Sequence, residues 1–209
     1  MASSLFGNAR RPGAAILDPA PEVLERVRGG VLARDTTLDL GAMAVTYPEG
    51  SYLGRGDRII LRIIQDTAGH RPIYFASAAG LMRDLGLDPW GVRHGLATKL
   101  RLRSLEGEGP PELTRASEEM GGEWFHVDRS LKLVRDVYRY RSLANRRVWP
   151  DRSTLNVPWH YYALFVQLSE VAPRPGAAEE AFAEELRRRA AEFLVTARGG
   201  RVALGGETR

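Results

Sequence analysis

Histidine is the side chain best suited to acid–base or metal chemistry near neutral pH, and this chain contains four of them. They are His70, His94, His126 and His160, and they lie in separate segments of the sequence. No two have the i, i+4 spacing that would bring both imidazoles to one metal ion on a helix. The chain has no cysteine, which excludes disulfides, thiolate ligands and thiol nucleophiles. We therefore expect no metal site and no cofactor.

Motifs for nucleophilic or phosphate chemistry are absent from the sequence. There is no Gly-x-Ser-x-Gly elbow, no phosphate-binding Walker loop and no Gly-x-Gly-x-x-Gly fingerprint. The glycine-rich segment 54–57 opens a predicted helix but follows no clear strand, so we interpret it as a loop before a helix. The carboxylates Asp84, Asp88 and Glu118-Glu119 are expected to be solvated, because nothing indicates a buried environment. No catalytic residue is predicted.

The most unusual local feature is Arg71-Pro72 placed directly before the apolar run 73–76. Proline is tolerated at the first residue of a strand, because its missing N–H costs no ladder hydrogen bond there. Arg71 could bind a phosphate or carboxylate at the sheet edge, or pair with Asp57 or Asp66, and the ion pair is the favoured interpretation. One candidate interaction or anion site follows from these segments. Its residues are Asp57, Arg71, Tyr74 and His94.

The elements that must position these residues alternate between helical and extended patterns. Residues 58–66 have apolar positions on one helical face, Asp57 stands where an N-cap belongs, and Gly69 follows as a stop signal. Three further elements are predicted between residues 73 and 105. They are a buried strand at Ile73–Ser77, a short helix at Leu81–Leu87 and a half-exposed strand at Ala97–Leu105.

The second half of the chain is predicted to be mainly helical. Glycines and prolines between Glu106 and Gly122 indicate a flexible connection, after which Asp128 caps a helix that extends to about Leu143. Helices at about 156–170 and 178–197 are predicted to form an antiparallel hairpin, with Pro158 in the first turn of the first helix. The hairpin has the size of a single tetratricopeptide-type repeat, and such repeats normally need about three copies to bury a core. It must therefore dock on the α/β part, pair with another chain or begin a longer array.

These elements predict an α+β fold: a small mixed sheet covered by helices, followed by a C-terminal tetratricopeptide-like helical hairpin. The predicted domain organisation has four parts. They are an irregular lead-in at 1–44, a small α/β domain at 45–122, a helical region at 123–197 and a flexible tail at 198–209.

Composition narrows the function classes further. The 209 residues carry a formal charge of +4, and the sequence pI of about 9.7 reflects arginine in place of lysine, since Lys99 and Lys132 are the only lysines. No nucleic-acid-binding motif accompanies this charge, so no nucleic-acid partner is expected. Residues 1–11 lack the apolar stretch of a signal peptide, and no segment approaches the roughly 20 apolar residues of a membrane helix. The chain as written is therefore expected to be soluble.

Several of these segments, in this order, resemble a bacterial membrane-protein family catalogued as glycosyltransferase family 117, or protein O-mannosyltransferase-like. Residues 71–76 form its most specific element, placed shortly after the Ile-rich helix of residues 57–66, and the resemblance covers about residues 45 to 195. The remaining similar segments are individually weaker. They are Leu85–Leu87, His94–Ala97, Val137–Arg141, Trp149–Asp151 and Asn156–Pro158.

The resemblance implies an N-terminal bundle of membrane helices with the polyprenyl-linked sugar chemistry and an acidic catalytic residue in an early extramembrane loop. No position of this chain matches that catalytic residue. We therefore expect the chain to be the C-terminal soluble region, a non-catalytic domain that supports the transferase or its acceptor. Its expected partner is the membrane-embedded part of the parent protein or a membrane subunit. It would lie at the extracytoplasmic face of the inner membrane, or in the cytoplasm if the chain is free-standing.

Two alternatives remain open at this point. The first is a protein- or peptide-binding module of tetratricopeptide type, in which the hairpin between Asn156 and Ala197 holds the ligand. The second is a small enzyme with Arg71, Tyr74 and His94 around the end of a strand, which ranks last because no nucleophile–base pair is evident.

Overall fold

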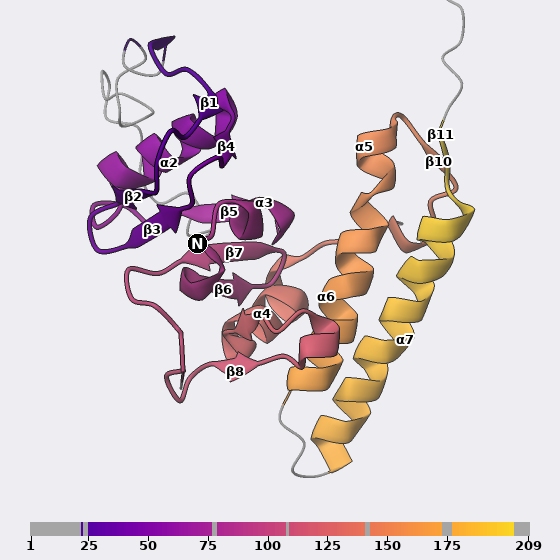
Figure 1. The fold of residues 1–209 in the computed structure, drawn as a ribbon. Coiled ribbons are helices and arrows are strands. Elements are labelled where there is room, and N and C mark those ends of the chain that lie inside the picture. Colours follow the sequence, from indigo (N-terminus) through magenta and orange to yellow (C-terminus); the bar gives the residue numbers. More distant parts are fainter. Residues whose placement is uncertain are drawn as a thin grey trace, which may run out of the picture. The chain divides into compact units, whose positions relative to one another are not determined.

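The computed structural model describes Glu22 and residues 25–76, 79–107, 109–140, 143–172 and 177–202 (Figure 1). It divides into two compact units, Met1–Ile73 and Tyr74–Arg209. The combination of small sheets, helices and a C-terminal helical pair confirms the predicted α+β class. The observed division differs from the predicted boundaries at residues 44 and 122, because one sheet of the second unit has strands on both sides of residue 122.

The first unit contains two short antiparallel strand pairs. Strand β1 (Gly30–Val31) pairs with β4 (Tyr52–Leu53), and β2 (Thr36–Asp39) pairs with β3 (Ala44–Tyr47). The prediction of an irregular lead-in through residue 44 is therefore wrong for its last 15 residues or so. The turn between β2 and β3 closes where the Asp39 carboxylate accepts the backbone N–H of Gly41, which has a φ of 87°.

Helix α2 (Arg55–Thr67) completes the first unit and buries Leu61 and Ile64, two of the predicted apolar positions. Its N-cap is Gly54, so the prediction of Asp57 as the N-cap is wrong by one turn. Asp57 lies at N3 instead, where its carboxylate accepts the Gly54 N–H at 2.8 Å. A carboxylate at N3 stabilises the helix start by bonding a free backbone donor near the positive end of the helix dipole. Gly69, with a φ of 89°, follows the last turn as predicted.

A five-stranded mixed sheet forms one side of the second unit. Its order is β5-β7-β6-β9-β8, and all neighbours are antiparallel except β6 and β9, which run parallel. The strands are β5 (Tyr74–Ala76), β7 (Ala97–Leu100), β6 (Gly91–His94), β9 (Trp124–Phe125) and β8 (Thr114–Arg115). Both predicted strands thus belong to one mixed sheet, although Ser77 lies outside the described residues.

The predicted strand at Ala97–Leu105 is too long, because β7 ends at Leu100. The Arg101 N–H donates to the carbonyl of Trp90, outside the pairs of β7 with its neighbouring strands. Leu102 is 41 % exposed, so the apolar–polar alternation of the sequence extends beyond the residues that pair in the sheet. The short helix α3 (Ala79–Asp84) starts and ends slightly before the predicted range, and a 3₁₀ turn at Asp88–Trp90 follows it.

The segment predicted as a flexible connection, Glu106–Gly122, has an ordered second half. It contains β8 and a 3₁₀ turn at Glu118–Met120, and it buries Leu113 and Ala116. These two apolar side chains anchor the segment, because their burial offsets the entropy of ordering a glycine-rich loop.

The helix predicted from Asp128 to Leu143 is shorter and starts earlier. Helix α4 (Val127–Lys132) begins with His126 as N-cap, whose Nδ1 accepts the Arg129 N–H at 3.4 Å. A π-helical turn at Leu133–Val137 follows, and the backbone leaves the helix at Tyr138. Tyr138 is held there by tertiary contact, since its hydroxyl accepts the Leu96 N–H at 2.9 Å. A 3₁₀ turn at Leu143–Asn145 leads on to the last third of the chain.

A small parallel ladder joins two segments near the end of the chain. Strand β10 (Val148–Trp149) pairs with β11 (Arg201–Val202), so the predicted flexible tail includes an ordered strand. Between them, the short helix α5 (Arg152–Leu155) starts at Asp151, whose carboxylate accepts the Thr154 N–H at 2.7 Å.

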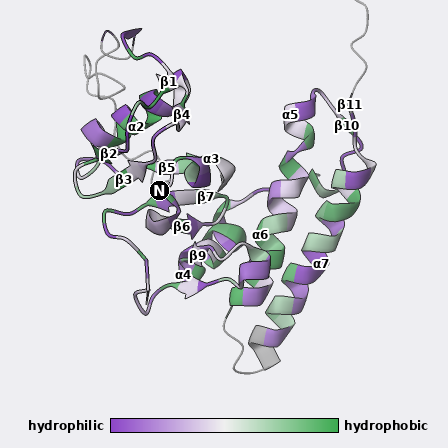
Figure 2. Ribbon diagram, viewed as in Figure 1, coloured by the Kyte–Doolittle hydropathy of each residue, from purple (hydrophilic) through white to green (hydrophobic). Residues whose placement is uncertain are grey.

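The predicted C-terminal helical hairpin is confirmed by α6 (Val157–Val171) and α7 (Ala177–Gly199), which pack on each other (Figure 1). Pro158 lies in the first turn of α6 as predicted. Figure 2 shows apolar and polar residues alternating along both helices, the pattern of helices with one buried face. Within the described residues, no helix combines the length and the apolar character needed to cross a lipid bilayer.

The hairpin docks on the α/β part of its own unit, the first of the three predicted options. One core cluster joins Phe125 of β9 and Val134 of the π turn to the buried faces of both helices. The helical members of this cluster are Tyr161, Leu164, Phe165, Leu168, Val171, Leu186, Ala190 and Phe193.

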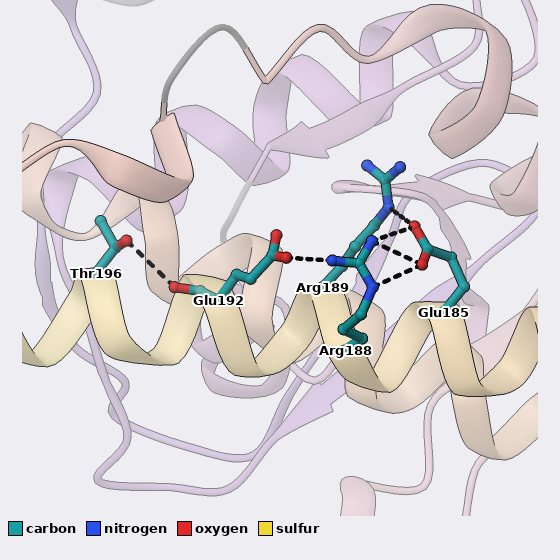
Figure 3. A network of polar contacts seen from close by, with 5 residues as sticks. All are labelled: Glu185, Arg188, Arg189, Glu192 and Thr196. Carbon is teal, nitrogen blue, oxygen red and sulfur yellow. Dashed lines mark hydrogen bonds and ion pairs between the residues drawn. The ribbon is translucent and has the colours of Figure 1, made fainter.

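The outer face of α7 carries a network of ion pairs between residues one turn apart (Figure 3). Glu185 accepts hydrogen bonds from both Arg188 and Arg189, and Arg188 also contacts Glu192. The two arginines lower the pKa of Glu185. Because these side chains are partly exposed, the network mainly reinforces the helix and keeps this face polar.

Candidate functional site

The four predicted candidate residues are divided between the two units. Asp57 and Arg71 belong to the first unit, whereas Tyr74 and His94 belong to the second. Asp57 has a structural role at the start of α2. Tyr74 and His94 are neighbours, with ring centroids 5.9 Å apart in an edge-on arrangement.

His94 has a second aromatic neighbour that the spacing of the sequence did not indicate. Its ring lies 5.3 Å from that of His126, also edge-on. The parallel register that pairs Arg93 with Phe125 brings the next residues of both segments together, and the His126 N–H donates to the Arg93 carbonyl at 3.1 Å. A spacing of about 30 residues becomes a contact only because β6 and β9 are adjacent.

The environment of His94 favours its neutral form. Burial first, and then the nearby charges of His126, Lys99, Arg129 and Arg101, lower the pKa of His94 from 6.5 to about 4. Among the described residues, no group of three or more histidine, aspartate or glutamate side chains could hold a metal ion. Two imidazoles alone do not complete a tetrahedral site.

This depressed pKa predicts a pH dependence of stability. The unfolded chain binds more protons at His94 than the folded chain between about pH 6.5 and 4, so the free energy of unfolding falls as the pH is lowered through that window. Urea unfolding at several pH values would measure this slope, and His94→Gln should reduce it. An unchanged slope in the variant, or a His94 pKa near 6.5 by NMR titration, would contradict the expectation.

A pocket of about 480 Å³ opens in the second unit beside the sheet. Its wall combines strand residues with the loops that follow α3, β7 and β8. The charged lining residues are Arg83, Asp88, Arg93, Glu106, Arg115, Glu118 and Glu123; Thr98 and Trp124 are the polar and aromatic ones.

Two of the three lining arginines have close carboxylate partners at the surface. Arg115 lies 2.7 Å from Glu118, and Arg83 lies 3.5 Å from Asp88. Both arginine side chains are more than half exposed, so these pairs are screened by water and contribute little to stability.

Arg93 differs from both, because it is only 7 % exposed. Its Nη1 lies 3.8 Å from Glu123 Oε1, and its buried Nε has no hydrogen-bond partner among the residues that the structure describes. The Arg93 charge also reaches α6, where burial first and then Arg93 lower the pKa of His160. A buried guanidinium whose Nε–H has no acceptor in the described part of the chain is the main unsatisfied polar group of the pocket wall.

Glu123 connects this arginine to α6. Its other oxygen, Oε2, accepts a hydrogen bond from Gln167 Nε2 at 3.2 Å, and Gln167 Nε2 also donates to the Met120 carbonyl. Glu123 is thus shared between the pocket wall and the helix behind it.

Sequence reasoning missed the Arg93 and Glu123 pair. Arg93 lies in β6, and its pairing with Thr98 in the middle of the sheet is known only from the structure, so no local signal identified it. Glu123 was predicted to begin the helical region 123–197 and had no predicted role, and only the β9 register places it beside Arg93.

The first unit has a pocket of its own, of about 450 Å³. Its floor is apolar, with Leu38, Leu53 and Leu61, and its rim carries arginines. The arginines are Arg26, Arg28, Arg58 and Arg62. Arg58 is tied to this unit by a hydrogen bond to the Gly30 carbonyl at 3.3 Å, which gives it a structural role.

Comparisons with known proteins identify no relative. No family model, no curated protein and no solved structure matches the chain.

Proposed function

We propose that this chain acts by binding, as a non-catalytic extramembrane domain of a glycosyltransferase-like bacterial membrane protein, where it supports the transferase or holds its acceptor. The observation that carries the proposal is the pocket of about 480 Å³ in the second unit. Its size suits a small polar ligand, and its paired arginines and carboxylates present donors and acceptors in fixed positions.

The chemistry of the lining supports binding over turnover. No histidine, cysteine, serine or lysine occurs among the described residues that line the pocket. Its arginines lie near carboxylates, an arrangement that engages these carboxylates in ion pairs and orients hydroxyl and carboxyl groups of a ligand. The pair of His94 and His126 is not part of this lining.

Binding can be tested with the full chain and a panel of monosaccharides, disaccharides and sugar phosphates. Saturation-transfer NMR should detect at least one ligand, and prolonged incubation should leave it unchanged. Glu106→Trp should abolish binding, because it adds bulk to a lining residue that is exposed, and folding should persist. Turnover of any ligand, or binding that Glu106→Trp leaves intact, would contradict the proposal.

The membrane setting rests on the resemblance and needs a separate test. Affinity capture of the tagged chain from detergent-solubilised membranes of its native host should recover one multi-spanning membrane protein in stoichiometric amount. Recovery of the chain alone, with small-ligand binding intact, would retain the binding domain and remove the transferase from the proposal.

The alternative of a tetratricopeptide-like peptide-binding module has less support. The apolar positions of α6 face the core of its own unit, so the described part of the hairpin offers no uncovered apolar groove. Its exposed large side chains, Trp159 and Val195, lie on different helices.

A further inference from the structure

We infer that Arg93 is the receptor for an oxyanion, either a carboxylate or a phosphate, of the ligand that occupies the pocket of the second unit. The inference rests on the proposed binding function and deepens it, because it names the chemical group that the ligand must carry. It also assigns Glu123 a role, as the carboxylate that competes with the ligand for the guanidinium.

Arg93 carries a buried charge that is incompletely compensated. Arg93 is 7 % exposed and its Nε–H has no acceptor within the described part of the chain. Burying an ionised group is costly unless close hydrogen bonds replace its hydration. Glu123 does so only in part, because 3.8 Å is within ion-pair range but exceeds the length of a hydrogen bond.

Arg93 belongs to the wall of the pocket, so a ligand can approach its guanidinium. Arg93 lines the pocket together with its direct strand partner, Thr98. A guanidinium presents Nε–H and Nη–H in one plane, a fork that matches the two oxygens of a carboxylate or phosphate. Nε itself is covered by neighbouring atoms in the structure, so an oxyanion supplies the acceptor that Nε lacks once the Arg93 side chain turns toward it.

The other arginines of the pocket are poor candidates for the same role. Arg115 already bonds Glu118 at 2.7 Å and donates its Nε–H to the Gly122 carbonyl. Arg83 pairs with Asp88, and its side chain is 72 % exposed. Among the described residues, the lining carries four carboxylates against three guanidinium groups, so their net charge does not attract anions. Selectivity for an oxyanion must come from the buried donors of Arg93.

Substitutions of Glu123 and Arg93 are expected to change the affinity for an oxyanion in opposite directions. The charge of Glu123 repels an incoming oxyanion, and it draws on the same guanidinium. Glu123→Gln keeps the side-chain shape and the acceptor for Gln167 but removes the charge, so it should tighten oxyanion binding about three- to tenfold. Arg93→Gln should weaken binding about tenfold or more, because it removes a charge-assisted pair of hydrogen bonds.

The experiment is an NMR titration of the full chain in which the arginine Nε–H resonances are followed. The probes are inorganic phosphate, glycerol 3-phosphate and acetate, with glycerol and acetamide as the matched neutral compounds and chloride as the ionic-strength control. The Arg93 Nε–H should shift with the anions and remain unchanged with the neutral compounds. A larger response to phosphates or to acetate identifies which oxyanion the site prefers.

Arg187→Gln is the matched control, since it makes the same change of charge in the second unit on a partly exposed side chain of α7 outside the pocket lining. It should alter the dissociation constant less than twofold. Urea unfolding of each variant checks its fold, and if Arg93→Gln does not fold, Glu123→Gln still decides the matter. Loss of anion binding in Glu123→Gln, or equal effects of Arg93→Gln and Arg187→Gln, would overturn the inference.

The two proposals fail in different ways. If neutral ligands bind the pocket and the Arg93 Nε–H does not respond to any anion, the binding function stands and the oxyanion receptor is wrong. If neither anions nor neutral ligands bind, both are wrong.

Discussion

Replacing Phe193 with alanine is expected to lower the free energy of unfolding by about 3–5 kcal/mol, the usual cost of deleting a fully buried aromatic ring. Phe193 is 1 % exposed, and its ring stacks on Tyr161 at a centroid distance of 4.9 Å. It also stacks on Phe165 at 5.7 Å, so one side chain of α7 contacts two of α6. Its loss leaves a cavity where the hairpin joins the core of its unit.

Urea unfolding followed by far-UV circular dichroism would measure this effect. Val195→Ala is the matched control on the same helix, because Val195 is 73 % exposed and its replacement should change the stability by less than about 0.5 kcal/mol. Phe193→Leu should fall between the two variants. Similar stabilities for Phe193→Ala and Val195→Ala would mean that α7 does not pack on α6 through this ring.

Replacing Gly95 with alanine is expected to cost about 2–4 kcal/mol. Gly95 follows β6 in the tight turn to β7 and has a φ of 63°, a region that side chains disfavour. A Cβ at this position would lie 2.2 Å from the Tyr138 hydroxyl, which accepts the Leu96 N–H. The variant therefore strains the turn and displaces the hydrogen bond that ties it to the segment after α4.

Two comparisons separate the backbone effect from the contact. Gly121→Ala has a similar positive φ of 96° and open space around its Cβ, so it should show the smaller, backbone part alone. Combining Gly95→Ala with Tyr138→Phe removes the nearest atom, and the two effects should then be less than additive. Equal costs for Gly95→Ala and Gly121→Ala, or strict additivity in the pair, would place the Tyr138 hydroxyl elsewhere.

Long and regular elements could be predicted from the sequence, whereas most short ones could not. The bounds of helix α2 and of the hairpin helices α6 and α7 were predicted within a few residues. Apolar residues that recur on one face over several turns are typical of a helix and not of a strand. The short strands β1 and β2 were missed, since two to four residues are too few for a period to show.

Tertiary contacts overrode local signals where the two competed. The helix predicted through Leu143 stops at Tyr138, because the hydroxyl of that residue bonds the turn of a distant hairpin. The strand predicted through Leu105 stops at Leu100, where the next N–H bonds the Trp90 carbonyl. Hydrogen-bond partners far along the chain decide such endings, and the local pattern contains no information on them.

The sequence by itself determined the α+β class, the helical hairpin and the lack of cysteine chemistry, because composition and periodicity act over short distances along the chain. Only the tertiary structure decided which chemical groups meet. The parallel pairing of β6 with β9 brings His94 beside His126 and Arg93 beside Glu123, although about 30 residues separate the partners. A register between strands distant in sequence depends on the packing of the whole sheet, which no local spacing encodes.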